Sequence, residues 1–197
     1  MPKEEARVLD LLSSILGGIQ RDTPDWLLRP GKQECGSEWG RISAIFRDLT
    51  GASLPESMRP VERRSVDGIM RFGGVERVFE YDETQHFNCF RAQTLTHYLD
   101  DVPTEFGKNR WLEESKRNTR LEGGGFAAPK PPLFPGENGR HRQRAFRDAL
   151  CDLLPPLYGY APTMRIAHFE VSTWLGASNA EARMRHLLSA RLGEDLT

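Results

Sequence analysis

An α/β fold, with helices packed on a mixed sheet, is what this sequence predicts. Three observations support it: a hairpin signal near the middle of the chain, helical patterns on both sides of it, and a later apolar strand that follows a helix. Residues 75–79 are rich in Val and Phe, as strands are. Gly73 and Gly74 precede this run, and paired glycines suit a two-residue hairpin turn because glycine reaches positive φ without strain.

A turn at Gly73–Gly74 would fix the register of the hairpin. Asp67 then lies opposite Glu80, and Ser65 lies opposite Asp82. Directly opposite residues point to the same face, so Asp67, Glu80 and Asp82 are expected to form one acidic cluster. A slip of one residue would separate Glu80 from Asp67. The other face is expected to be apolar and to carry Val66, Met70, Phe72, Phe79 and Tyr81.

The acidic cluster suggests a metal site. Three carboxylates held close together repel one another and raise each other's pKa. A divalent cation with oxygen ligands is the simplest way to neutralise them, and Mg²⁺ typically takes one or two carboxylates together with water and substrate phosphates. Asp67, Glu80 and Asp82 are therefore the candidate ligands of Mg²⁺, or of Mn²⁺ in its place.

The composition excludes several classes of protein. A chain of 197 residues suits one sizeable core with a helical extension. No apolar run approaches the length of a membrane span, and the N-terminus does not resemble a signal peptide. Cys35, Cys89 and Cys151 are widely spaced, which argues against a disulfide framework or a cysteine-rich zinc site. We expect a bacterial cytoplasmic protein with no membrane contact.

Arginine dominates the basic residues, although the net charge is only −1. Of the 27 basic residues, 22 are arginine, which suits bidentate contacts with phosphate. A GC-rich genome that favours arginine codons would give the same bias. Arg140, Arg142, Arg144 and Arg147 cluster on one expected helix. They are candidates for contact with nucleic-acid phosphates, and a solvated helix face is the alternative interpretation.

Helical spacing and turn signals predict the remaining elements. We expect Ser37 to cap the second helix, Ser178 and Glu181 to form a capping box for the last one, and Gly51 and Gly193 to end these helices. The predicted helices cover residues 2–20, 38–49, 87–99, 109–120, 139–154 and 179–192, and a buried strand covers 160–171.

Two levels of organisation follow from this pattern. Residues 1–60 read as a helical N-terminal extension packed on the core, and residues 61–197 as the main domain. Residues 100–138 are rich in Gly and Pro and read as an irregular insertion, because loops of that length in compact domains are usually functional or disordered.

The central motifs resemble the PD-(D/E)xK nuclease superfamily. Within it, the order and residue types are similar to the branch near very-short-patch-repair endonucleases and their uncharacterised relatives. The resemblance covers roughly residues 60–175 and implies a restriction-endonuclease-like fold. Two positions depart from the pattern, since Asp82 stands at the usual lysine and Glu83 at the usual glycine. The matching pieces are Val66-Asp67-Gly68, the E-Y-D-E-T-Q-H-F run from Glu80 to Phe87, Arg147-Asp148-Ala149-Leu150, and the stretch from Gly159-Tyr160 through Met164-Arg165-Ile166 to Glu170-Val171.

The resemblance implies Mg²⁺-dependent hydrolysis of a phosphodiester, with DNA as the expected partner. Asp67 and Glu80 would bind the metal, and Asp82 would bind it directly or through water. Ordinary strand-surface charges are the alternative for these acids.

Three further residues would act on the substrate. Gln85 would orient water or a phosphate, His86 would act as general acid or base, and Arg165 would stabilise charge in the transition state. The alternatives are a helix cap for Gln85, a packed histidine for His86, and an ion pair with Glu170 or a site acid for Arg165.

These features leave three functions open. The first is a PD-(D/E)xK-type DNA nuclease serving repair, restriction or defence against foreign DNA. The second is a catalytically inactive module of the same fold that binds nucleic acid or a partner protein through the arginine helix and the insertion. The third is a structural subunit whose N-terminal helices mediate a homodimer or a protein complex. Metal binding separates the first from the others.

Overall fold

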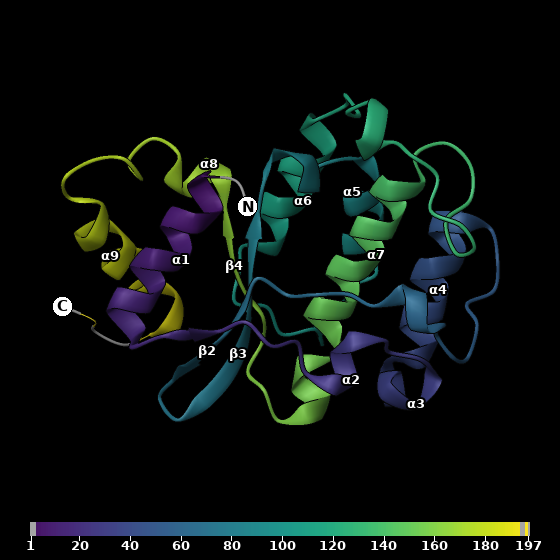
Figure 1. Cartoon of the computed structure of the whole chain (residues 1–197), viewed down its shortest axis with the longest axis horizontal. Coiled ribbons are helices and arrows are strands. Elements are labelled where there is room, and N and C mark those ends of the chain that lie inside the picture. The colour runs from purple at the N-terminus through teal and green to yellow at the C-terminus, as the bar shows by residue number, and fades with distance from the viewer. Residues whose placement is uncertain (1–2, 194–195, 197) are drawn as a thin grey trace.

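A four-stranded sheet runs through the middle of the protein, with helices on both of its faces (Figure 1). The computed structural model describes residues 3–193 and residue 196. In sheet order, β1 (Ile19–Gln20), β2 (Gly68–Phe72) and β3 (Val75–Asp82) are antiparallel, and β4 (Met164–Ala167) runs parallel to β3. The predicted α/β class, a mixed sheet flanked by helices, is confirmed.

The hairpin has the predicted register. Phe72 pairs with Val75 across Gly73 and Gly74, whose φ values are 58° and 77°. The ladder ends at Gly68, which pairs with Phe79, so Asp67 lies just before β2 rather than within it. Its carboxylate nevertheless reaches β3, because Tyr81 N donates to Asp67 Oδ2 over 2.8 Å.

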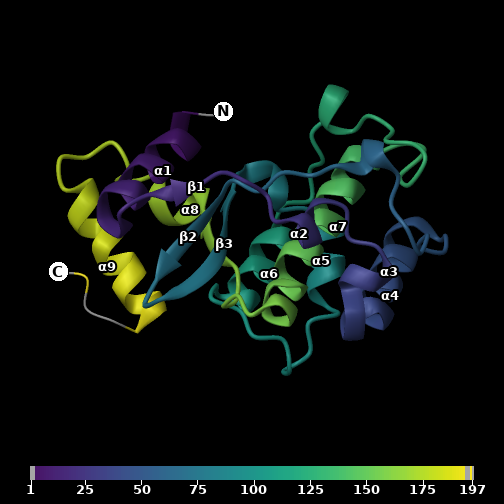
Figure 2. The same ribbon diagram turned by 60° about the horizontal axis from the view of Figure 1, so that its bottom comes forward.

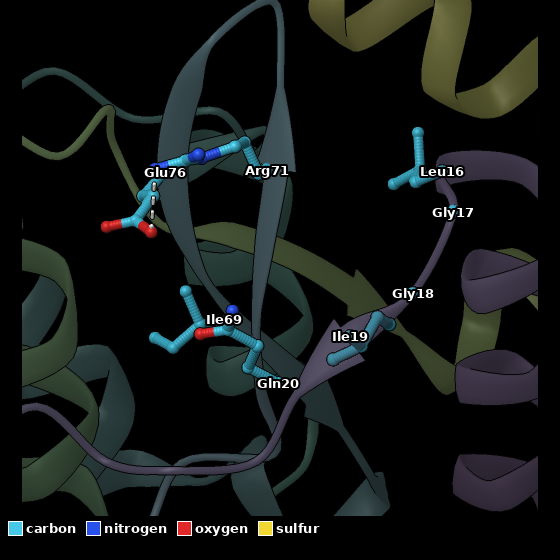
Figure 3. A pocket seen from close by; sticks show the side chains of 8 residues that line it. All are labelled: Leu16, Gly17, Gly18, Ile19, Gln20, Ile69, Arg71 and Glu76. Atoms are coloured by element: carbon cyan, nitrogen blue, oxygen red, sulfur yellow. Dashed lines mark hydrogen bonds and ion pairs between the residues drawn. The ribbon is translucent and has the colours of Figure 1, made fainter.

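The outer edge of the sheet is short and open. Ile19 and Gln20 of β1 cover only the first half of β2, and a cleft of about 490 Å³ lies beside them (Figure 3). An ion pair of Arg71 and Glu76, with 3.3 Å between Nη2 and Oε1, spans the far side of this cleft. Gly68 must be glycine, since a Cβ there would lie 2.3 Å from Ile19 Cγ2.

One face of the sheet packs on the two ends of the chain. Helices α1 (Lys3–Leu16), α8 (His168–Val171) and α9 (Ala180–Leu192) lie together on this side (Figures 1 and 2). The predicted apolar face of the hairpin is confirmed for Met70, Phe79 and Tyr81, which are buried against this group. The buried residues of α1 are Val8, Leu9, Leu11 and Leu12. They pack against the sheet and the C-terminal helices, so the apolar face of α1 is already buried within the protein.

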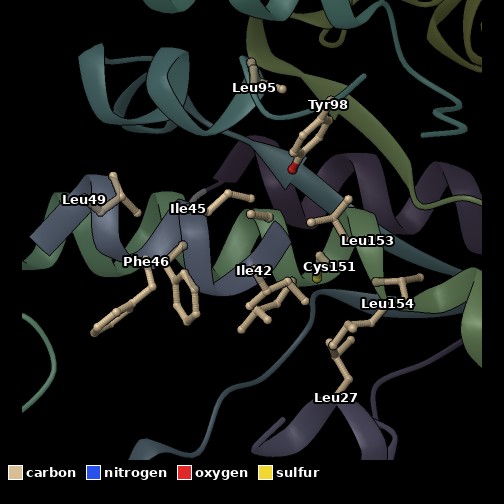
Figure 4. Packing of buried hydrophobic residues seen from close by; sticks show 14 of the residues in the cluster. Leu27, Ile42, Ile45, Phe46, Leu49, Leu95, Tyr98, Cys151, Leu153 and Leu154 are labelled. Carbon is tan, nitrogen blue, oxygen red and sulfur yellow. The ribbon is translucent and has the colours of Figure 1, made fainter. Parts of the chain in front are cut away.

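The opposite face carries the larger core. It is covered by α4 (Trp39–Thr50), α5 (Cys89–Leu95), α6 (Lys108–Arg117) and α7 (Gly139–Leu153). Figure 4 shows Ile42, Ile45 and Phe46 of α4 among side chains from α7. Val66, predicted on the other face, packs here instead, because it precedes β2 and does not follow the alternation of that strand.

Several predicted boundaries were wrong for local reasons. The first helix ends at Leu16, since Gly17 and Gly18 have positive φ and the next two residues join the sheet. The fourth strand ends at Ala167, where Glu170 Oε2 accepts from Ala167 N over 2.9 Å and starts the short helix α8. Asn179, not Ser178, is the N-cap of α9, so the predicted capping box is absent there.

Two helix ends were predicted correctly. Gly51 and Gly193 end α4 and α9 in the left-handed conformation, with φ of 73° and 68°. Ser37, however, lies inside a short 3₁₀ helix and does not cap α4. The remaining short helices are α2 (Asp25–Leu28), α3 (Lys32–Cys35), η1 (Gly36–Glu38), η2 (Pro60–Glu62), η3 (Thr84–His86), η4 (Gly124–Phe126) and η5 (Pro155–Tyr158).

Residues 1–60 and 100–138 both contribute to the packed structure. The N-terminal segment supplies β1, and the segment after α5 supplies Phe106, Trp111 and Phe134 to the larger core. Trp111 is 1 % exposed and touches the rings of Phe87, Phe106 and Phe169. In the part of the chain that the structure describes, no helix combines the length and the apolarity needed to cross a membrane.

Candidate active site

A polar cavity of about 220 Å³ lies between the hairpin and α7. Asp67, just before β2, and Glu80, near the end of β3, both line it, as the hairpin register predicted. His86 of η3 reaches the same cavity. The structure therefore brings together these three predicted site residues from the segment before β2, from β3 and from η3.

The wall opposite the hairpin is one face of α7. Arg140, Arg144 and Arg147 line the cavity, because residues three and four apart lie on the same side of a helix. Arg142 lies off this face and was wrongly grouped with the other three. It packs over the ring of Phe90 at 5.6 Å and donates to backbone carbonyls of the preceding loop.

Arg64 is a site residue that the sequence analysis did not assign. It is buried, and its Nη2 lies 3.4 Å from Glu80 Oε1 and 2.7 Å from Cys151 Sγ. Cys151 in turn donates to the same Glu80 oxygen over 2.9 Å. Arg64 Nη1 donates to the carbonyl of Arg147 over 2.8 Å, so this side chain joins the hairpin to α7. In the sequence it stands beside Arg63, a few residues before β2, and little else marks it.

Two of the three carboxylates that line the cavity, Asp67 and Glu80, have raised pKa values. Burial, followed by the charge of Asp67, raises the pKa of Glu80 to about 8, while Arg64 opposes the shift. Burial also raises the pKa of Asp67, although the hydrogen bond from Tyr81 N works in the other direction. A cation between these groups would relieve the repulsion, and carboxylate oxygens are the ligands that Mg²⁺ prefers.

The raised pKa of Glu80 predicts a pH-dependent stability. Folding favours the protonated form, so its contribution is full below pH 4.5 and is lost as the pH rises through about 8. In EDTA the wild type should lose up to about 5 kcal/mol over this range, a loss that Glu80→Gln avoids. Thermal unfolding at pH 5 and pH 9, which spans most of this range, measures the loss. An equal loss of stability in Glu80→Gln and in the control Glu76→Gln would contradict it.

Arg165 lies behind the cavity rather than in it. Its side chain is fully buried, with Nη1 2.5 Å from Asp82 Oδ1 and Nε 2.7 Å from Asp152 Oδ1. Nη2 lies 3.6 Å from Asp148 Oδ1 and donates to the Asp148 carbonyl over 3.2 Å. The expected direct contact with substrate charge does not fit this position. The alternative of an ion pair with Glu170 or a site acid is confirmed for the site acid Asp82, whereas Glu170 pairs with Arg191.

Asp82 is also buried next to Arg165, in a layer of charged side chains that includes Asp148 and Asp152. It is 1 % exposed, and Trp111 Nε1 donates to its second oxygen over 2.6 Å. Asp82, His86 and Asp148 bring ligand atoms within 4.8 Å of one another and could hold a metal ion. A cation would compete there with Arg165, which already pairs with both carboxylates.

His86 is held between two of these acids. Its Nδ1 lies 3.1 Å from Asp148 Oδ2 and 3.4 Å from Asp82 Oδ1. Burial lowers the pKa of His86, but the charges and hydrogen bond of Asp148 and Asp82 outweigh burial, so the net shift is upward. Protonated His86 and two buried guanidinium groups together balance the negative charges of Asp82, Asp148 and Asp152. The guanidinium groups belong to Arg165 and to Arg91, whose Nη2 lies 2.8 Å from Asp152.

Gln85 lies outside the cavity lining, and its side-chain amide donates to Glu83. The helix that follows is capped by Asn88, whose Oδ1 accepts from Phe90 N over 3.0 Å. Asn88, rather than Gln85, therefore provides the cap that was considered for Gln85. The acids Asp148 and Asp152 were not proposed as site residues, although Asp148 stood within the motif that suggested the family.

Searches with the chain against protein-family models, curated proteins and solved structures gave no match.

Proposed function

We propose that this protein is a Mg²⁺-dependent nuclease that hydrolyses phosphodiester bonds in DNA on a restriction-endonuclease-like core. The observation that carries the proposal is the cavity itself, in which Asp67 and Glu80 face three arginines of α7. The carboxylates attract a cation and the arginines attract an anion. A phosphodiester with its metal ion satisfies both requirements at once.

Asp67 and Glu80 are the residues that would hold the metal. Their pKa values are raised, and Arg64 is the one guanidinium bonded to either of them in the described chain, so the negative charge of their ionised forms is poorly balanced and a bound cation would stabilise it. The Asp82–His86–Asp148 group is instead balanced by buried arginine, which makes it the weaker site. Bound Mg²⁺ would polarise the phosphoryl group and lower the pKa of an attacking water.

The remaining cavity residues would bind the substrate and move a proton. Arg140, Arg144 and Arg147 would bind phosphate oxygens. His86, held protonated by Asp148 and Asp82, would donate its proton to the leaving oxygen. Arg165 would act as a positioning residue, since it fixes the two carboxylates that orient His86.

The arginine face of α7 predicts a specific salt dependence. Each phosphate contact that is lost should lower the slope of log K against log salt by about 1. We therefore expect Arg140→Ala and Arg144→Ala to bind DNA more weakly and with a shallower slope. Arg142→Ala, on another side of the helix, is the matched control and should keep the wild-type slope. Equal slopes for all variants, measured by fluorescence anisotropy in EDTA, would contradict this arrangement.

One observation favours an alternative function. Asp82 occupies the position where the superfamily usually has a lysine, and both of its oxygens are taken by Arg165 and Trp111. A catalytically inactive module that only binds nucleic acid would tolerate this arrangement. It would show the same salt dependence but no cleavage.

Cleavage of a supercoiled plasmid separates the two functions. The nuclease should convert the plasmid to nicked or linear forms in Mg²⁺ or Mn²⁺ and leave it intact in EDTA. If plasmid stays intact in both metals while the protein still binds DNA, the proposal fails and the binding module stands.

A further inference from the structure

Phe126 is an exposed aromatic residue at the end of η4 (Gly124–Phe126), a turn that packs against α7 and projects beyond its N-terminal end (Figure 2). Its side chain is 42 % exposed. The preceding glycines, Gly123 to Gly125, have open space where a Cβ would lie, so the turn is not crowded by the rest of the protein.

Other exposed large side chains do not share its surroundings. Tyr158, the other aromatic among them, stacks on Trp26 at 4.4 Å and donates its hydroxyl to the carbonyl of Glu34. Within the described chain, no aromatic ring packs on Phe126. Of the two exposed aromatic residues in the described chain, Phe126 is therefore the one without a ring partner.

Phe126 is linked directly to the cavity. The guanidinium carbon of Arg144, a cavity residue, lies 5.8 Å from the centre of the Phe126 ring. Arg144 Nη1 is buried and has no hydrogen-bond partner in the described chain. One residue, Arg144, thus lines the cavity and also contacts the exposed ring of Phe126.

We infer that Phe126 stacks on an unpaired base next to the phosphate bound by Arg144, so that the preferred substrate is DNA with single-stranded character at the cavity. The phosphate and base of one nucleotide are joined by a single sugar, which suits an arginine and an aromatic ring in contact. Aromatic stacking is a general means of holding single-stranded nucleic acid. In an intact duplex each base is already stacked on its neighbours, so the ring would find no free base. This inference rests on the proposed DNA-binding cavity.

Binding of single-stranded and duplex DNA tests it. The probes are a fluorescent 12-nucleotide single strand and a duplex of the same sequence, measured by anisotropy in EDTA with the full chain. Phe126→Ala should weaken single-strand binding about tenfold and change duplex binding less than about twofold. Phe126→Trp should restore single-strand binding. Leu99→Ala removes another exposed apolar side chain, outside the cavity lining, and should change neither affinity.

A second readout reports the stacking itself. An oligonucleotide that carries 2-aminopurine should lose fluorescence on binding the wild type and Phe126→Trp, and should lose much less on binding Phe126→Ala. The inference is overturned if Phe126→Ala binds both probes like the wild type, or loses both affinities equally. Cleavage in Mg²⁺ is scored separately. If the wild type shows stacking that depends on Phe126 but does not cleave DNA, the nuclease proposal fails. If cleavage and binding are unchanged in Phe126→Ala, only the stacking role fails.

Discussion

Asp67→Asn is expected to lower the rate of metal-dependent DNA cleavage by about 10³-fold or more, because the variant keeps the shape of the side chain but removes one of two charges that would hold the cation. The amide can still accept the hydrogen bond from Tyr81 N, which the carboxylate accepts over 2.8 Å. The fold should therefore survive, and the loss should concern the metal and the reaction.

Two measurements separate these effects. Single-turnover cleavage gives the rate, and electron paramagnetic resonance of free Mn²⁺ gives the binding of the ion. Asp10→Asn, which neutralises an exposed aspartate of α1, is the control and should leave both unchanged. If Asp67→Asn binds Mn²⁺ as tightly as the wild type, the ion lies elsewhere, and the Asp82–His86–Asp148 group becomes the first place to look.

Arg165→Met is expected to destabilise the fold by about 3–5 kcal/mol, because it leaves buried carboxylates without their shared counter-charge. Arg165 is fully buried and pairs with Asp82 and Asp152 over 2.5 and 2.7 Å. Methionine fills much of the same volume, so the main loss is electrostatic. His86 and Arg91 would still balance two of the charges of Asp82, Asp148 and Asp152, so one of these three buried carboxylates would have no counter-charge.

Urea unfolding of the wild type and the variant measures this difference. Arg117→Met is the control, since Arg117 is largely exposed and pairs with Glu114 on the same helix, where such pairs contribute little. Its stability should stay within about 0.5 kcal/mol of the wild type. A loss below about 1 kcal/mol in Arg165→Met would show that this buried layer is not held by Arg165.

The hairpin could be predicted from the sequence because its information is local. Two glycines fix the turn, the turn fixes the register, and the register places Glu80 beside Asp67. The helix C-termini at Gly51 and Gly193 are local in the same sense. Three of the four arginines grouped from the sequence share one face of α7. Arg142 lies on another side of the helix, because residues close in sequence need not lie on the same helical face.

The buried layer behind the site could not be predicted, because its contacts join distant segments. Asp82 is bonded by Trp111 from α6 and by Arg165 from β4, while Arg64 reaches Glu80 and Cys151 across the space between hairpin and α7. A sequence shows that such residues are charged, but it does not show which of them will be buried together. For that reason Arg165 was expected to contact the substrate.

The most direct test of the central claim is the initial rate of plasmid nicking by the wild type, by Glu80→Gln and by Glu76→Gln, each in Mg²⁺ and in EDTA. Glu76 lies on the same strand as Glu80 but pairs with Arg71 at the sheet edge, away from the cavity. We expect nicking in Mg²⁺ and none in EDTA, with the activity retained in Glu76→Gln and lost in Glu80→Gln. Nicking that persists in Glu80→Gln, or no nicking by the wild type in Mg²⁺, would contradict this expectation.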